Sequence, residues 1–251
     1  MAFVDFLLFQ QVTLLIAAVL ISYTAVMAWW AMRRNDSAGV KSALKSAAIP
    51  IGALGLVATG LSMWLEEAWP LPGSYNILFT DVYMLFGLTL VILAVSMAFQ
   101  LKLQYAGVFA FVAGLTALSY GWVGWHLGMT KEPFETFLLY AGFGAAGIFA
   151  APATFVADYY LAHPDGSAFA SGLSLATARR RPSIQVATRG AQPISPVAAE
   201  TASTEVSLPA FRLPIYISVT VLIFVVFMAL AGLAALLYFD TTLPAHLASA
   251  P

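Results

Sequence analysis

Six long apolar segments restrict what this chain can fold into more than any other feature of the sequence. A helix needs about 20 predominantly apolar residues to cross the hydrocarbon core of a bilayer. Segments of about that length or longer occupy residues 6–32, 47–65, 77–100, 105–129, 136–162 and 213–239. Only 9% of the residues are charged, whereas soluble domains carry about 25%. The sequence therefore predicts an all-α, polytopic integral membrane protein with six transmembrane helices.

The charges around the first segment indicate that it is a retained helix. Asp5 precedes the segment, and Arg33 and Arg34 follow it. A cleaved signal peptide has the opposite arrangement, with positive charge in front of a short apolar centre. We therefore expect the N-terminus to lie outside, with Trp29 and Trp30 at the cytoplasmic interface.

The distribution of positive charge predicts the orientation of the whole chain. If the six segments alternate in direction, ten of the eleven Lys and Arg residues fall on one side, and only Lys131 falls on the other. Lys and Arg accumulate in cytoplasmic loops, so the N- and C-termini are both expected to be extracytoplasmic. The predicted location is the inner or plasma membrane, as a multi-pass protein. The ten residues on the cytoplasmic side are Arg33, Arg34, Lys41, Lys45, Lys102, Arg179, Arg180, Arg181, Arg189 and Arg212.

Composition divides the chain into three parts. Residues 1–162 form a five-helix transmembrane body, and residues 163–212 form a cytoplasmic linker rich in Ser, Ala, Pro and Arg. Residues 213–251 hold the sixth transmembrane helix and a short outer tail. Within the body, we expect a polar loop over residues 35–46 and place Pro50 in the first turn of the second helix, where proline is tolerated.

Acidic and polar side chains gather at the predicted outer face. Asp81 lies about one turn inside the third helix, where a charged group is costly. It is either a metal ligand, proton acceptor or cation site, or a carboxylate that stabilises the positive N-terminal end of its own helix. The candidate outer-face polar cluster consists of Glu66, Glu67, Asp81, His126, Glu132 and Glu135.

His126 raises the question of a metal site, because it lies at about the same depth as Asp81 and Glu66. Imidazole and carboxylate groups are ligands of zinc, copper and iron, so these three residues are the metal candidates. No HxxxH or ExxH spacing occurs in the chain. The alternative is a hydrogen-bonded interfacial histidine beside Trp122 and Trp125. No cofactor is firmly implied.

Several activities lack the residues that they need. No lysine lies inside an apolar segment, so there is no Schiff base for a retinal. His126 and His163 lie at opposite ends of their helices, which disfavours a haem held between two histidines. The chain has no cysteine, which excludes disulfides and thiol nucleophiles. It also lacks a phosphate-binding glycine loop, a serine elbow and an HExxH motif.

Small residues on two segments predict close approach of helices. Gly147 and Ala151 are four residues apart in the fifth segment, as are Gly124 and Gly128 in the fourth. These faces either pack inside the bundle or contact other subunits and lipid. The cluster Arg179, Arg180 and Arg181 is a second candidate contact, for anionic lipid head groups or an acidic partner. The alternative is that these residues are ordinary cytoplasmic charge.

One stretch resembles a known family. The segment PGSYNILFTD, at residues 72–81, is followed directly by VYMLFGLTLVIL, at residues 82–93. Together they are similar to the signature of a family of predicted prokaryotic membrane proteins known as domain of unknown function 981. The resemblance covers roughly residues 6–162. It implies a multi-helix membrane protein and no established activity, so no catalytic residue is transferred.

The sequence favours a non-catalytic role. No charged pathway is buried among the predicted helices, and the small-residue faces suit packing against other chains. We expect an accessory or structural subunit of a larger membrane complex, for example an oxidoreductase such as a copper-dependent monooxygenase. The alternative is a small transporter, channel or metal-binding membrane enzyme that uses an acidic extracytoplasmic vestibule. The expected partners are the lipid bilayer and other membrane subunits, and no nucleic acid.

Overall fold

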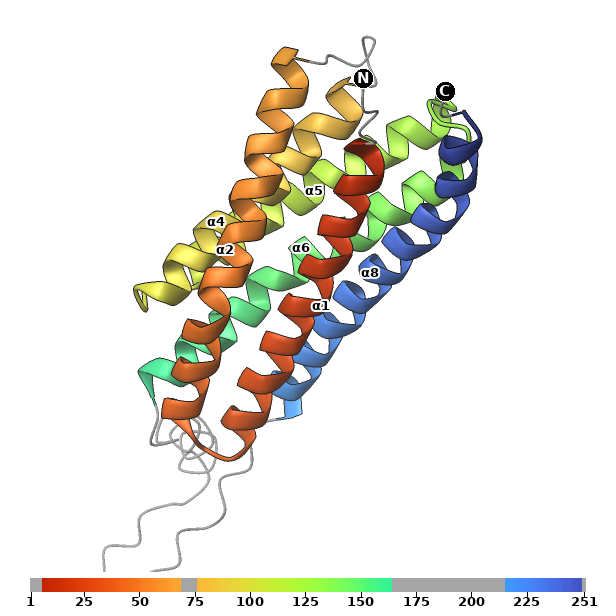
Figure 1. The fold of residues 1–251 in the computed structure, drawn as a ribbon. Coiled ribbons are helices and arrows are strands. Elements are labelled where there is room, and N and C mark those ends of the chain that lie inside the picture. Colours follow the sequence, from red (N-terminus) through yellow and green to blue (C-terminus); the bar gives the residue numbers. More distant parts are fainter. Residues whose placement is uncertain (1–5, 69–75, 164–214, 250–251) are drawn as a thin grey trace, which may run out of the picture.

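The computed structural model describes residues 6–68, 76–163 and 215–249, and every regular element in them is helical (Figure 1). Six helices in these ranges are long and apolar enough to cross a membrane, as many as the sequence predicted. A π-helical turn, η1, runs directly into α4, so these two elements form one span. The elements are α1 (Phe6–Arg33), α2 (Ser37–Ala68), η1 (Ile77–Asp81), α4 (Val82–Ala98), α5 (Gln104–His126), α6 (Pro133–Ala162) and α8 (Ile215–Ser249).

The helices form a ring in which each one packs mainly on its neighbours in chain order. The last helix, α8, packs on both α6 and α1 and so closes the ring. Figure 1 shows α8 alongside α1, with the first turns of α1 and the last turns of α8 at the same end of the bundle. We call this the acidic end, defined by Glu66, Glu67, Asp81, Glu132, Glu135 and Asp240. The opposite, basic end is defined by Arg33, Arg34, Lys41, Lys45 and Lys102.

Three helices end in the same way, with one residue in the left-handed conformation. These residues are Asn35 (φ 55°) after α1, Gln100 (φ 53°) after α4 and Gly128 (φ 57°) after α5. In each case the next N–H donates to a carbonyl five residues back, at 2.9 to 3.0 Å. This arrangement satisfies carbonyls that would otherwise have no partner at a helix end. The resulting tight turns bring consecutive helices side by side.

The connection between α1 and α2 is much shorter than the sequence suggested. Because α2 begins at Ser37, the loop predicted over residues 35–46 is wrong, and Pro50 lies inside the helix rather than in its first turn. The helix can begin this early because Asp36 caps it, with Oδ1 accepting a hydrogen bond from the N–H of Gly39 at 2.8 Å.

The polar residues that suggested a loop lie on the outer face of α2. Lys41 and Lys45 are exposed, whereas Val40 in the same turn is completely buried. This part of the helix is therefore amphipathic and continues beyond the apolar span. Apolar length alone does not mark where such a helix begins.

The last helix also extends further than predicted. The backbone of α8 is helical to Ser249, so most of the tail expected after residue 239 continues the helix. The predicted linker lies outside the described residues apart from its first residue, 163, and so does the cluster Arg179, Arg180 and Arg181.

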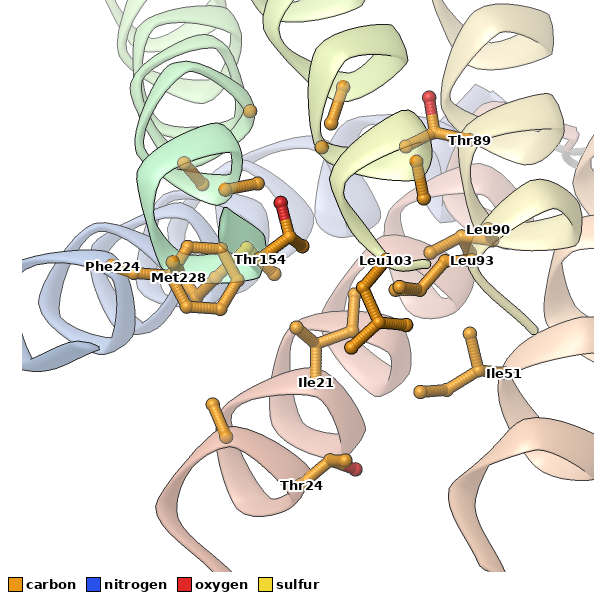
Figure 2. A pocket seen from close by; sticks show the side chains of 18 of the residues that line it. Ile21, Thr24, Ile51, Thr89, Leu90, Leu93, Leu103, Thr154, Phe224 and Met228 are labelled. Atoms are coloured by element: carbon orange, nitrogen blue, oxygen red, sulfur yellow. The ribbon is translucent and has the colours of Figure 1, made fainter. Parts of the chain in front are cut away.

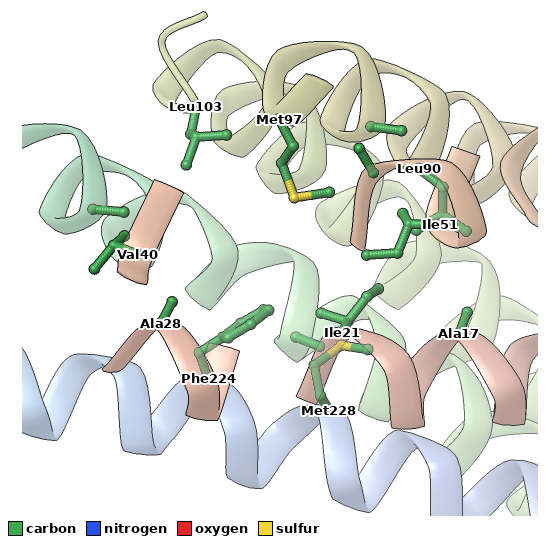
Figure 3. Close-up of a cluster of buried hydrophobic side chains, with 14 of the residues drawn as sticks. Ala17, Ile21, Ala28, Val40, Ile51, Leu90, Met97, Leu103, Phe224 and Met228 are labelled. Atoms are coloured by element: carbon green, nitrogen blue, oxygen red, sulfur yellow. The ribbon is translucent and has the colours of Figure 1, made fainter. Parts of the chain in front are cut away.

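Buried side chains from several helices meet along the inner side of the ring (Figure 3). Ile51 of α2 and Leu90 of α4 are at most 2% exposed, and they lie near Ile21 of α1 and Met228 of α8 (Figure 3). For helices in a membrane, lipid tails are as apolar as these side chains, so burial from water would not hold them together. In that setting close packing supplies the stability instead.

Glycines provide the closest packing between neighbouring helices. A Cβ atom added to Gly55 of α2 would lie 2.8 Å from the carbonyl oxygen of Gly87 in α4. A Cβ atom added to Gly114 of α5 would lie 2.5 Å from the carbonyl oxygen of Gly144 in α6. No real side chain fits at such distances, so each pair of backbones is in direct contact.

Ring closure by α8 leads to a cross-linking prediction. A Cβ atom added to Gly232 of α8 would lie 3.1 Å from the Cβ atom of Ala18 in α1, slightly closer than the roughly 3.5 to 4.5 Å between the Cβ atoms of a disulfide. We therefore expect the pair Ala18→Cys and Gly232→Cys to cross-link under mild oxidation, with the linked peptides identified by mass spectrometry. The control pair combines Gly232→Cys with Gly60→Cys, which faces open space on α2. Equal cross-linking of both pairs would contradict the closed ring.

Candidate functional site

A cavity of about 180 Å³ lies inside the ring. We call it the central cavity. All six spans contribute to its wall, including Ile21 and Thr24 of α1, Phe224 and Met228 of α8, and Thr154 of α6 (Figure 2). Six helices arranged in a ring enclose more space than a four-helix bundle does, and here the side chains do not fill it.

The shape of the central cavity is elongated along the helices. Its wall includes both Val82 and Met97 of α4. Fifteen residues of α-helix separate these two positions, or about 22 Å at 1.5 Å per residue. For comparison, the hydrocarbon core of a bilayer is about 30 Å thick.

Small residues on two helices leave this space open. Where α5 and α6 face the cavity, most of their residues are alanine or glycine, including Ala106, Ala110, Ala146 and Ala150. These side chains are too short to reach the opposite wall. The same small residues that let α5 and α6 touch each other therefore also create the cavity.

The few hydroxyl groups in the wall are already satisfied by their own helices. Thr24 donates to the carbonyl oxygen of Leu20 at 2.7 Å, and Thr89 donates to that of Leu85 at 2.7 Å. Thr154 donates to the carbonyl oxygen of Ala151 at 2.8 Å. Such bonds to the preceding turn are the usual way in which a hydroxyl sits in an apolar helix. The central cavity is therefore apolar in character.

A second, smaller cavity of about 60 Å³ adjoins the central cavity toward the acidic end. We call it the tyrosine cavity. The two share the wall residues Val82, Phe86, Ala117 and Phe143. The rings of Phe86 and Phe143 meet edge to face with centroids 5.3 Å apart, and they mark the boundary. The wall of the tyrosine cavity includes the polar residues Gln10, Gln11, Tyr83, Tyr140 and Tyr238.

The tyrosine hydroxyls in this wall are paired. Tyr140 donates to the carbonyl oxygen of Leu78 in η1 at 2.5 Å. Tyr83 is hydrogen-bonded to Thr13, whose own hydroxyl is 2.8 Å from the carbonyl oxygen of Gln10. Tyr238 is hydrogen-bonded to the side chain of Thr136. These bonds connect α1, α4, η1, α6 and α8 at the acidic end.

A third cavity, of about 470 Å³, lies at the basic end and shares Leu44, Met97 and Leu103 with the central cavity. Asp158 of α6 lies in its wall, and its two carboxylate oxygens accept hydrogen bonds from the backbone N–H groups of Leu103 and Gln104, at 2.9 and 2.8 Å. A carboxylate at a helix N-terminus is favourable, so Asp158 fixes the start of α5 against α6.

The structure places the predicted outer-face cluster at the acidic end. Glu66 and Glu67 are exposed at the end of α2, and Glu132 is exposed just before α6. Glu135 is half-buried in the first turn of α6. Asp81 is half-buried at the end of η1, where it accepts a hydrogen bond of 3.4 Å from the hydroxyl of Tyr120.

His126 is exposed at the end of α5 and lies among aromatic rings. Its Nδ1 atom is 3.0 Å from the carbonyl oxygen of Trp122, and the two rings have centroids 4.1 Å apart. A carbonyl oxygen only accepts, so this hydrogen bond places the proton on Nδ1. Within the described ranges, no three or more His, Asp and Glu side chains are grouped to hold one metal ion. The structure thus does not assemble His126, Asp81 and Glu66 into such a group.

Two of the predicted small-residue contacts lie within the chain. A Cβ atom added to Gly147 would lie 2.6 Å from the carbonyl oxygen of Ala110 in α5. One added to Gly107 of α5 would lie 3.0 Å from the Cα atom of Ala151. Gly147 and Ala151 therefore form the face that packs on α5.

The glycines at the end of α5 have different surroundings. A Cβ atom added to Gly124 would lie 3.3 Å from Leu78, whereas Gly128 faces open space and adopts a positive φ at the end of its helix.

Sequence reasoning missed the cavities and the hydrogen-bonded groups around them. One signal was present: Gln10 and Gln11 are adjacent polar residues inside an apolar segment, and both are buried. Asp158 gave no such signal, because its role as a cap for α5 depends on how α5 and α6 pack.

Comparisons with known proteins give one match. A model of the family described as "Protein of unknown function (DUF981)" matches residues 1–163. The matched part ends with α6 and leaves out α8, which closes the ring. No curated protein and no solved structure matches the chain.

Proposed function

The chain belongs to the DUF981 family of proteins of unknown function, and from its structure we propose that it is an integral membrane protein that binds one long apolar molecule in the central cavity. The molecule is the hydrocarbon part of a membrane lipid, either an isoprenoid or an acyl chain. The observation that carries this proposal is the elongated apolar cavity inside the ring.

The cost of an empty cavity supports an occupant. Unfilled apolar space inside a protein is destabilising, so an apolar occupant of this cavity of about 180 Å³ would stabilise the bundle. An apolar cavity of roughly 150 Å³ in a soluble protein stays dry and takes up benzene. A chain that dissolves in lipid is surrounded by suitable occupants at high concentration.

The wall chemistry selects the kind of occupant. Because the hydroxyls of Thr24, Thr89 and Thr154 are bonded to their own helices, they offer little to a polar ligand. Contact with the ligand is therefore mainly dispersion, which favours a flexible hydrocarbon that follows the long axis of the cavity.

The charge distribution supports an orientation with the acidic end outside the cell. The guanidinium of Arg33 lies 5.1 Å from the ring centroid of Trp29, and that of Arg34 lies 4.9 Å from Trp30. Arginine and tryptophan together are typical of a membrane interface. Lys41 also lies at this end. The positive-inside rule therefore favours an orientation in which the basic end faces the cytoplasm and the protein lies in the inner or plasma membrane.

The role of accessory or structural subunit in a larger complex, such as a copper-dependent monooxygenase, stays a prediction. A ligand-binding ring is compatible with that role, because binding requires no catalytic group. The transporter, channel and metal-enzyme alternatives also stay predictions, and an apolar cavity favours a lipid-like ligand over an ion.

Photolabelling tests the proposal. A long hydrocarbon probe that carries a diazirine is allowed to partition into membranes that contain the protein and is then activated. We expect labels on Phe224 and Met228, which line the cavity, as well as on lipid-facing residues such as Leu222. An excess of unlabelled hydrocarbon should suppress the cavity labels far more than the surface labels, because only the cavity saturates. Labels confined to lipid-facing residues would refute the proposal.

A further inference from the structure

We propose that the tyrosine cavity holds the head group of the same bound molecule, and that this head group is an uncharged quinone ring whose carbonyl accepts a hydrogen bond from Gln10. The inference rests on the proposed function, because it assigns the tail of the quinone to the central cavity. It concerns binding alone and requires no electron transfer by this chain.

Gln10 supplies the first observation. Its side chain is 5% exposed and lies in the wall of the tyrosine cavity, and its Nε2 atom has no hydrogen-bond partner. A buried amide N–H without an acceptor is costly, because it has lost its hydrogen bond to water and gained none in the protein. A ligand oxygen in the cavity would remove that cost.

The neighbouring groups define the charge and polarity of the ligand. None of the described residues that line the tyrosine cavity is Asp, Glu, Lys, Arg or His. A charged head group would lack a counter-ion in a region of low dielectric constant. The proton of Tyr140 is already donated to Leu78. The group without a partner is therefore the Nε2 donor of Gln10, and its complement in a ligand is a neutral acceptor such as a carbonyl oxygen.

The rings in the wall define the shape of the ligand. Six aromatic side chains line this small cavity. Aromatic rings pack well against a flat conjugated ring, by stacking or edge-to-face contact. The six are Phe79, Tyr83, Phe86, Tyr140, Phe143 and Tyr238.

The two cavities adjoin each other at the Phe86–Phe143 pair, and in this proposal one molecule passes these rings and occupies both cavities. Phe86 and Phe143 belong to both walls, and the central cavity leads away from them toward the basic end. A planar ring with two carbonyls fits the tyrosine cavity, and a long isoprenoid tail joined to that ring fits the central cavity. Membrane quinones have that chemistry.

Titration of the lipid-depleted full chain in detergent, followed by native mass spectrometry, tests the assignment. The probes are a benzoquinone with an isoprenoid tail, its reduced quinol, a diacylglycerol and an isoprenoid hydrocarbon without a head group. We expect the quinone to bind most tightly. Gln10→Leu should weaken quinone binding by about tenfold, as for loss of one hydrogen bond, and leave hydrocarbon binding unchanged. Gln10→Met is a second variant without the N–H, and Gln104→Leu repeats the Gln to Leu change at the basic end as the control.

The outcomes separate the two proposals. If Gln10→Leu and Gln10→Met, both shown to be folded by circular dichroism, bind the quinone as wild type does, the head-group assignment fails while the proposed function stands. If diacylglycerol bound as tightly as the quinone, the assignment of a planar ring would be wrong. If the quinol bound more tightly than the quinone, the assignment of Gln10 as the hydrogen-bond donor would be wrong. If none of the four probes binds the wild-type chain, the proposed function itself fails.

Discussion

Replacing Gly147 by alanine is expected to destabilise the isolated chain by about 2 to 3 kcal/mol, in the upper part of the range for overpacking. The new Cβ atom would lie 2.6 Å from the carbonyl oxygen of Ala110 and 3.0 Å from the Cα atom of Gly114. Both are backbone atoms of α5, so neither can rotate away as a side chain would. The two helices would have to separate along their closest contact.

The matched control is Gly60→Ala. Nothing lies within 4 Å of a Cβ atom added to Gly60. In an open position on a helix, alanine is more favourable than glycine by about 1 kcal/mol at most. Denaturant titration in mixed detergent micelles, followed by circular dichroism, compares the two variants. If Gly147→Ala were as stable as Gly60→Ala, the face around Gly147 would be free for another subunit rather than packed on α5.

Replacing Ala150 by phenylalanine is expected to abolish binding in the central cavity. Ala150 lies in the cavity wall on α6, and a phenyl ring at this position would occupy the space assigned to the hydrocarbon tail. We expect labelling of Phe224 and Met228 by the diazirine probe to fall at least about tenfold, which corresponds to a loss of about 1.4 kcal/mol in binding free energy. The variant should remain folded, because the new side chain enters existing space.

The control repeats this substitution on the outside of the ring. Ala53 is an exposed alanine on α2 and does not line any of the three cavities. Ala53→Phe should therefore keep the wild-type labelling pattern. Equal loss of labelling in both variants would point to a general disturbance of the bundle, and unchanged labelling in Ala150→Phe would show that the ligand does not occupy the central cavity.

The number of spans could be predicted from the sequence because the physical requirement is local. A helix in lipid satisfies its own backbone hydrogen bonds, so a long apolar segment is enough to identify a span. Helix ends depend on finer features. The start of α2 is set by the carboxylate of Asp36 and by the left-handed conformation of Asn35. The pattern of apolar residues contains no information about either feature.

The cavities could not be predicted, because they depend on which residues face one another. Ala110 and Ala150 lie on different helices, and their short side chains matter only because the ring places both in the same wall. The order of the helices around the ring, with α8 against α1, is likewise not encoded in hydropathy. For the same reason, Asp81 and His126 could be assigned to one end of the bundle, but their actual neighbours, Tyr120 and Trp122, could not.

Native mass spectrometry of the full chain, released from cell membranes in a mild detergent, tests the presence of a bound molecule most directly. We predict a main species heavier than the polypeptide by the mass of one apolar molecule, which organic extraction then identifies. The extra mass should be absent from Ala150→Phe and present in Ala53→Phe. A wild-type protein that carries no extra mass, or the same extra mass in Ala150→Phe, would contradict ligand binding inside the six-helix ring.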